Sequence, residues 1–200
     1  MNTKNLFEGK LVRLRALQPG DEEIIFHQQQ DAEIARLDSY IGWPKSLAQV
    51  KDELEKQDRK EKNDDRYLMI ETLDGKNIGG VNTQLSDPRN GVFSIGIGLG
   101  ERTEWGKGYA KEAMLIMLRY MFHELRYQKC NISVYDINPR ALGFYRHLGF
   151  IDEGRLRRVY FSNDSYHDEV LLGITREEFN EIYPDWQVTL DEEEQFNRIP

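Results

Sequence analysis

A glycine-rich strand that runs directly into a long apolar helix constrains the fold of this chain more than any other segment. Residues alternate in type from Val92 to Gly100. One face of a strand there would carry the apolar residues Phe93, Ile95, Ile97 and Leu99. The other face would carry the small residues Ser94, Gly96, Gly98 and Gly100. Residues 107–126 are then predicted to form a helix of about five turns that is apolar on most sides. Because such a helix packs on a sheet, the segment predicts the strand–turn–helix unit of an α/β domain.

The glycines on one face of that strand allow two interpretations. Glycine weakens a strand, so Gly96, Gly98 and Gly100 at every second position indicate that another group approaches this backbone closely. That group could be a ligand, or it could be a helix packed tightly on this face. The strand by itself does not decide between them.

The turn between strand and helix carries two more glycines, Gly106 and Gly108, separated by Lys107. A helix N-terminus exposes unpaired N–H groups and the positive end of the helix dipole, which together form an anion site. Glycines there let a phosphate approach without obstruction by a Cβ atom. The alternative is a capping turn without a ligand. The sequence has no P-loop spacing, and its glycines lack the spacing of a dinucleotide-binding turn.

The segment from Asn138 to Phe150 is the second informative stretch. Asn138 suits the N-cap of a helix, Pro139 its first turn and Gly149 its C-terminal stop. Tyr145 lies one helical turn beyond Ala141, so the two share a face. Capping and core packing alone would account for these residues, and a ligand-binding role for them is the competing interpretation.

Patterning along the rest of the chain predicts the remaining elements. Strands are expected at residues 11–17, 67–72, 78–85, 132–137, 155–161 and 169–174. Two further helices are expected, one capped by Asp21 and one by a capping box at Ser46 and Gln49. We therefore expect one α/β (α+β) domain over residues 1–182, with a mixed, mostly antiparallel sheet of about seven strands flanked by about four helices. A polar tail, residues 183–200, follows it.

Composition excludes several classes of protein. Hydrophobic residues are 39% of the 200, and the formal charge of −8 argues against nucleic acid as a partner. No apolar run reaches the roughly 20 residues of a membrane span, and the first ten residues lack the apolar core of a secretory signal. We therefore expect a cytoplasmic location and no membrane partner. The only cysteine is Cys130 and the four histidines lack metal-ligand spacing, so neither a disulfide nor a metal site is expected.

The segment from Trp105 to Ala110, followed by Glu112 and Ala113, resembles motif A of the GNAT superfamily of N-acetyltransferases, Gln/Arg-x-x-Gly-x-Gly/Ala. Trp105 stands where that motif has Gln or Arg, which resembles the branch that acetylates ribosomal-protein N-termini and polyamines. Residues 138–150 are similar to the second cofactor segment of the superfamily. The resemblance covers about residues 10–174 and implies a GNAT-type fold with acetyl-CoA as the acetyl donor.

The resemblance also implies roles for individual residues. The CoA pyrophosphate would be held by the backbone of Trp105, Gly106, Lys107, Gly108, Tyr109 and Ala110, and the pantetheine arm by that of Ile97, Gly98 and Leu99. Asn138 would contact the cofactor, and Tyr145 would be the general acid that protonates the departing thiolate. The sequence does not identify the general base, for which Glu71, Glu101, Glu33 and a water relay all stay open.

The expected activity is direct transfer of the acetyl group to a primary amine of a protein N-terminus, a polyamine or a small molecule. The alternative is a non-catalytic CoA-binding module with a regulatory role; the motif spacing disfavours a nucleotide-binding protein. Loops at residues 38–45 and 160–167 are expected to select the acceptor, with Tyr40, Trp43 and Tyr166 either lining its pocket or packing in the core. Pairing through C-terminal strands, frequent in the superfamily, implies a homodimer.

Overall fold

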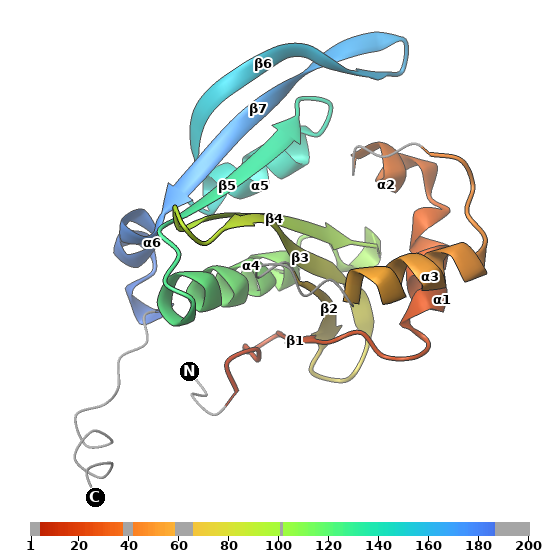
Figure 1. The fold of residues 1–200 in the computed structure, drawn as a ribbon, viewed down its shortest axis with the longest axis horizontal. Helices are drawn as coiled ribbons and strands as arrows, with labels where there is room; N and C mark the ends of the chain where they lie inside the picture. Colours follow the sequence, from red (N-terminus) through yellow and green to blue (C-terminus); the bar gives the residue numbers. More distant parts are fainter. Residues whose placement is uncertain (1–4, 38–41, 59–65, 101, 187–200) are drawn as a thin grey trace, which may run out of the picture.

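A seven-stranded sheet forms the centre of the molecule, with the strand order β1-β2-β3-β4-β5-β7-β6 (Figure 1). The computed structural model describes residues 5–37, 42–58, 66–100 and 102–186. The strands are β1 (Val12–Arg15), β2 (Tyr67–Thr72), β3 (Asn77–Asp87), β4 (Val92–Leu99), β5 (Lys129–Tyr135), β6 (Ile151–Ser162) and β7 (Ser165–Thr175). Neighbouring strands are antiparallel except β4 and β5, which are parallel. The predicted class and the mixed, mostly antiparallel sheet are confirmed.

Six α-helices occur in the described residues, two more than expected. They are α1 (Asp21–Gln29), α2 (Ala32–Leu37), α3 (Leu47–Asp58), α4 (Tyr109–Arg119), α5 (Pro139–His147) and α6 (Arg176–Ile182). The capping box predicted before α3 is present, because Ser46 and Gln49 exchange both of its hydrogen bonds. Asn138 caps α5 as predicted by accepting the N–H of Ala141 at 3.0 Å.

The two additional helices also start at caps. The carboxylate of Asp31 accepts the N–H groups of Glu33 and Ile34 at the start of α2. A complete capping box of Thr175 and Glu178 opens α6. Both signals are visible in the sequence, but α2 is only six residues long and α6 directly continues a strand. Periodicity over such short stretches is too weak to predict a helix.

Several predicted boundaries were wrong, and β5, β6 and β7 each begin three or four residues before their expected starts. Asp21 is the first residue of α1 and not its N-cap, because Gly20 takes that position with φ +103°. The long helix ends earlier than expected: α4 stops at Arg119, and a π-helical turn, Tyr120–Glu124, completes the segment. The expectation that this segment packs on a sheet is met, since every residue from Ala113 to Arg119 is buried.

The incomplete pairing of the parallel strands β4 and β5, in the middle of the sheet, leaves room for a site. Residues Val92 to Ser94 of β4 pair with Lys129 to Asn131 of β5, and although both strands are fully described, their pairing stops there. On its other side β4 stays paired with β3 as far as Leu99. The second half of β4 therefore has one free edge, toward which α5 and α2 project (Figure 1).

The end of the chain bears on the predicted domain boundary. Tyr183 and Trp186 pack against the main core, so the first residues of the expected tail are part of the folded unit. Residues 187–200 lie outside the described ranges, and the tail there stays a prediction. Among the helices of the described ranges, none has both the length and the apolar character needed to cross a membrane.

Candidate active site

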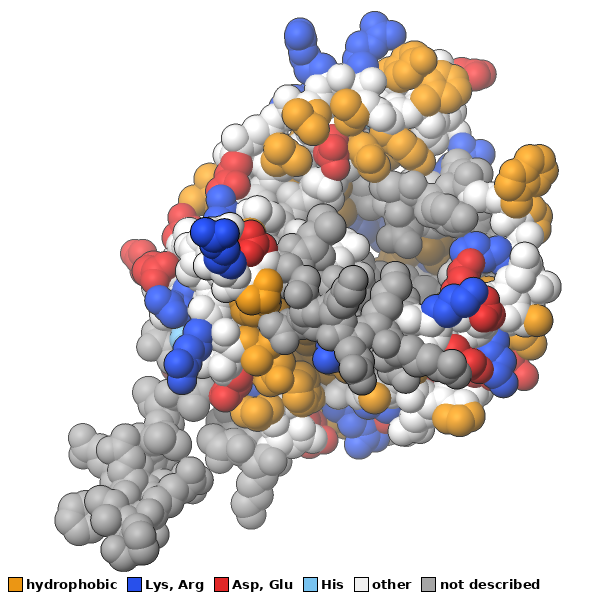
Figure 2. Space-filling view, in the orientation of Figure 1, with side chains coloured by type: hydrophobic (Ala, Val, Ile, Leu, Met, Phe, Trp, Pro, Cys, Tyr) orange, Lys and Arg blue, Asp and Glu red, His pale blue; other side chains and the backbone are white. Residues whose placement is uncertain are grey.

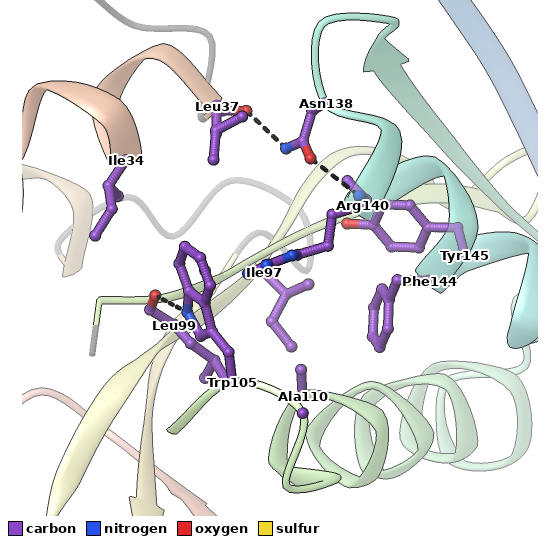
Figure 3. Close-up of a pocket in the computed structure, with 13 residues that line it drawn as sticks. Ile34, Leu37, Ile97, Leu99, Trp105, Ala110, Asn138, Arg140, Phe144 and Tyr145 are labelled. Atoms are coloured by element: carbon purple, nitrogen blue, oxygen red, sulfur yellow. Dashed lines mark hydrogen bonds between the residues drawn. The ribbon is translucent and has the colours of Figure 1, made fainter. Parts of the chain in front are cut away.

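A cavity of about 530 Å³ lies at the free edge of β4 (Figure 3). Its walls come from β4, the turn before α4, the start of α4, α5 and α2. The lining residues are Ile34, Leu37, Ile97, Gly98, Leu99, Trp105, Gly106, Ala110, Asn138, Arg140, Ala141, Phe144 and Tyr145. Most of these side chains are apolar, as is usual for a cavity that holds a small molecule.

The backbone of β4 gives this cavity a polar edge. The N–H of Gly100 donates to the carbonyl of Ile78 in β3 at 3.1 Å. Because hydrogen-bonded positions alternate along an antiparallel pair, Gly98 also faces β3 with its N–H and C=O, whereas Ile97 and Leu99 direct theirs away from β3. The carbonyl of Leu99 accepts the indole N–H of Trp105 at 3.0 Å. Ile97 therefore offers backbone groups to the cavity.

The glycines at the end of β4 are explained by different surroundings. A Cβ atom at Gly96 would lie 2.6 Å from the side chain of Asn82, and one at Gly100 would lie 2.1 Å from that of Gln28 in α1. Close packing by the protein itself explains these two. A Cβ at Gly98 would meet nothing within 4 Å, so this glycine opens onto free space beside the cavity. Helix packing thus accounts for Gly100 and a side chain of β3 for Gly96, whereas the ligand interpretation stays a prediction for Gly98.

The turn before α4 requires glycine for its backbone. Gly106 has φ +79° and Gly108 has φ +90°, values that are strained for other residues. Gly108 is the N-cap of α4, and no side chain caps the helix. The first N–H groups of α4 are therefore available to an anion beside the cavity, which Gly106 and Ala110 line.

Charged side chains around this turn are already paired. Glu104 accepts hydrogen bonds from Lys107 at 2.8 Å and Lys76 at 2.7 Å, and these two cations lower its pKa to about 2. Glu112, in the first turn of α4, accepts the N–H groups of residues 10–12. Lys107 and Lys76 therefore offset the charge of Glu104, whereas Glu112 keeps its negative charge and is held by the backbone of residues 10–12.

Helix α5 contributes Asn138 and Tyr145. Besides capping α5, Asn138 donates from Nδ2 to the carbonyl of Leu37 in α2 at 3.1 Å, so one side chain ties two walls together (Figure 3). Tyr145 is 6% exposed and packs edge-on against Phe144 and Phe150. It belongs to the core and also lines the cavity, so the two interpretations of this residue do not exclude each other.

The structure brings together eight of the predicted site residues in the cavity wall: Ile97, Gly98, Leu99, Trp105, Gly106, Ala110, Asn138 and Tyr145. Lys107, Gly108 and Tyr109 lie in the adjoining turn and first helical turn but do not line the cavity. Sequence reasoning missed five lining residues as members of the site: Ile34, Leu37, Arg140, Ala141 and Phe144. The spacing of Asn138, Ala141 and Tyr145 on one helix face could have indicated Phe144. The cap at Asp31 marks a helix but does not show that α2 lines the cavity, and no local signal marks Arg140.

The proposed bases are not part of this wall. Glu71 is held by Arg15 at 2.5 Å and Arg13 at 2.6 Å, and hydrogen bonding to Arg15 lowers its pKa despite burial. Glu33 pairs with Arg102 at 2.7 Å. Glu101 lies outside the described residues. Among the described residues that line the cavity there is no carboxylate and no histidine.

Other expectations concern residues away from the cavity. Cys130 is fully buried, and burial raises the pKa of its thiol, as expected for a small core residue. Trp43 is 92% exposed and Tyr166 56% exposed, so neither lines the cavity or packs in the core, and Tyr40 lies outside the described residues. Arg155 pairs with Asp136 and Asp168 on the outer hairpin.

Fold and cavity together define the class of protein. Residues 12–151 match the family described as Acetyltransferase (GNAT) domain, so this chain belongs to the GNAT acetyltransferases. It is an acyltransferase that uses acetyl-CoA as its donor. The free edge of β4, the open Gly98 and the unblocked start of α4 suit a molecule with a slender arm and phosphates.

Comparison with individual proteins supports the same family. The chain is 37% identical over 171 residues to the prophage-derived N-acetyltransferase YokL of Bacillus subtilis, covering 86% of this chain and 93% of YokL. It is 31% identical over 159 residues to spermidine N(1)-acetyltransferase of Vibrio cholerae, covering 78% and 87%. The structure of a Vibrio cholerae spermidine N-acetyltransferase with CoA and spermine aligns with a TM-score of 0.77 at 24% identity, over 86% of this chain and 99% of that one. That alignment supports the fold.

Proposed function

We propose that this protein acetylates a primary amine of a polyamine by direct transfer from acetyl-CoA. The observation that carries the proposal is the cavity that brings together a free β-strand edge, an uncapped helix start and a tyrosine side chain. The polyamine acceptor is supported by the spermidine N(1)-acetyltransferase relative and by the net charge of −8. A protein N-terminus and a small-molecule amine are the other acceptors considered.

Each part of the cavity has a task in this proposal. The bound donor supplies an activated acetyl thioester. The backbone of Ile97 aligns the arm of the donor and offers an N–H to the oxygen that becomes negative during attack. The N–H groups at residues 106–110 hold the phosphates. Asn138 caps the start of α5, the helix that carries Tyr145 nearer its other end.

Tyr145 manages a proton in this proposal. Its side chain is nearly buried at the cavity wall, where its hydroxyl holds a proton that it donates to the departing thiolate sulfur. The amine must lose a proton as well. Since the described part of the cavity wall has no carboxylate or histidine, we propose that water carries this second proton.

We also propose that the protein is a homodimer. The outer hairpin of β6 and β7 exposes Leu156, Val159, Phe161 and Tyr166, each at least 46% exposed. In Figure 2 hydrophobic side chains gather near the tip of this hairpin, at the top of the view. Exposed apolar side chains next to one another often mark an interface. Sedimentation equilibrium tests this proposal, and a monomer at micromolar concentration would contradict it. The cytoplasmic location stays a prediction.

Acetyl transfer is tested by following thiol release from acetyl-CoA with spermidine, spermine, an Ala-initiated peptide and a small aromatic amine. Mass spectrometry of the products verifies one acetyl group per thiol. We expect kcat/KM for the polyamines to exceed that for the peptide. A higher kcat/KM for the peptide would contradict the polyamine acceptor and favour a protein N-terminus. Tight CoA binding without thiol release from any amine would favour the regulatory-module alternative.

A further inference from the structure

Arg140 is a cation in the cavity wall whose charge is not paired with a carboxylate. Its guanidinium carbon lies 4.2 Å from the centre of the Trp105 ring, and both residues line the cavity (Figure 3). In the described ranges, no ion pair or hydrogen bond involves its guanidinium. Arg102, Arg146 and Arg155 each have a carboxylate partner.

Lys107, another cation near the start of α4, is already engaged by a carboxylate. Lys107 donates to Glu104, which also accepts from Lys76 and is 7% exposed. Two hydrogen bonds from cations keep Glu104 ionised, since its pKa is about 2. A phosphate at this helix start would have to compete with Glu104 for Lys107, whereas Arg140 gives up no ion pair to bind it.

Stacking on Trp105 leaves the donors of Arg140 available. A guanidinium lies flat on an aromatic ring and keeps its five N–H groups in the plane, where they can bind a phosphate in a bidentate manner. The indole is itself fixed, because its N–H donates to the carbonyl of Leu99 at 3.0 Å. Trp105 therefore holds a long, flexible side chain in one place, which reduces the entropy lost on binding.

We propose that Arg140 binds a phosphate group of acetyl-CoA and that Trp105 is the platform that positions it. This inference rests on the cavity being the donor site, as in the proposed function. It also gives a physical role to the tryptophan at the position where the superfamily motif has Gln or Arg: the indole supports a cation contributed by α5. CoA carries its phosphates as a pyrophosphate and a 3′-phosphate, and either one could be the partner.

Calorimetric titration of CoA and dephospho-CoA, which lacks the 3′-phosphate, tests the role of Arg140. We expect Arg140→Gln to weaken CoA binding roughly 10- to 100-fold and Arg140→Lys by less. The matched control is Arg146→Gln, which removes the same charge from α5 at a residue paired with Asp152 outside the cavity, and should change the affinity by less than about twofold. If dephospho-CoA binding falls as much as CoA binding, the pyrophosphate is the partner. If only CoA binding falls, the partner is the 3′-phosphate.

The salt dependence separates a charge contact from lost packing. The affinity of the wild-type protein for CoA should fall more steeply with salt than that of Arg140→Gln. Trp105→Leu should weaken CoA binding, Trp105→Phe should weaken it less, and the effect of Trp105→Leu should shrink when Arg140 is already Gln. Equal CoA affinity in Arg140→Gln and the wild type would overturn the inference, as would a weaker affinity with an unchanged salt slope. Wild-type CoA binding without spermidine acetylation would instead overturn the proposed acceptor.

Discussion

The wall of the cavity formed by β4, α4 and α5 differs from the wall formed by α2 in what holds it in place. The first wall depends on backbone: the pairing of β4 with β3, the positive φ of Gly106 and Gly108, and burial of α4. The α2 wall depends on side-chain contacts. Arg102 binds Asp31 at 2.6 Å, Arg36 binds Asn163 at 2.5 Å, and Asn138 binds the carbonyl of Leu37.

The difference indicates which wall can move. No residue of α2 is fully buried, and most of its contacts involve exposed groups, which contribute little stability. The β4–α4–α5 wall belongs to the main hydrophobic core. We propose that the rigid wall holds the constant donor and that the loosely held α2 wall moves when the amine enters or leaves.

The largest effect is expected at the rigid wall, from Tyr145→Phe. Loss of the general acid should lower kcat roughly 100-fold or more, while the dissociation constant for CoA stays within about twofold. Steady-state kinetics and calorimetry measure the two quantities. Tyr120→Phe is a matched control, because Tyr120 packs against Phe7 away from the cavity. Turnover at the wild-type rate in Tyr145→Phe would remove Tyr145 from the mechanism.

Gly108→Val should have the next largest effect. Valine at φ +90° is strained, so the turn must shift and move the N–H groups at the start of α4. We expect CoA binding to weaken roughly 10- to 100-fold, since charge-assisted hydrogen bonds are lost. Gly143→Ala is the control: Gly143 is in α5, and a Cβ there meets nothing within 4 Å. If CoA affinity survives in Gly108→Val, the turn does not bind the phosphates.

Asn138 hydrogen-bonds to both walls, so two substitutions at this position can distinguish its effect on α5 from its effect on α2. Asn138→Ala removes both the cap of α5 and the bond to α2, and should lower the free energy of unfolding by about 1 kcal/mol. Asn138→Asp keeps the capping oxygen and loses the donor to Leu37, so it should preserve stability yet speed hydrogen exchange in residues 32–37. Exchange at the wild-type rate in Asn138→Asp would mean that this bond does not hold α2.

Arg102→Gln should have the smallest effect. Releasing Asp31 and Glu33 loosens α2, so KM for the amine should change by a factor of about two to five while CoA affinity stays constant. The bond to Arg102 lowers the pKa of Asp31 from 3.8, so the pair contributes fully above about pH 4 and is lost as the pH falls through the lowered pKa. Thermal unfolding at pH 7 and pH 3 checks this. Arg89→Gln, at the exposed β3–β4 turn, is the control, and a stability difference as large at pH 3 as at pH 7 would contradict the account.

The same difference explains what could be predicted from the sequence. Gly106, Gly108 and Asn138 act through local rules of backbone and capping, so β4, the turn and α5 were predicted close to their observed bounds. The α2 wall and the stack of Arg140 on Trp105 join residues far apart in the chain. No local pattern encodes such pairs. The capping box of α6 is a local signal that the sequence does carry.

A crystal structure of the protein with CoA tests the central claim most directly. The pantetheine arm should lie along Ile97 and Leu99 at the free edge of β4, with the pyrophosphate at the N–H groups of residues 106–110. The sulfur should lie within hydrogen-bond reach of the Tyr145 hydroxyl. CoA bound elsewhere would contradict the account, for example in the second cavity of about 310 Å³ that residues of α1 and α3 help to line.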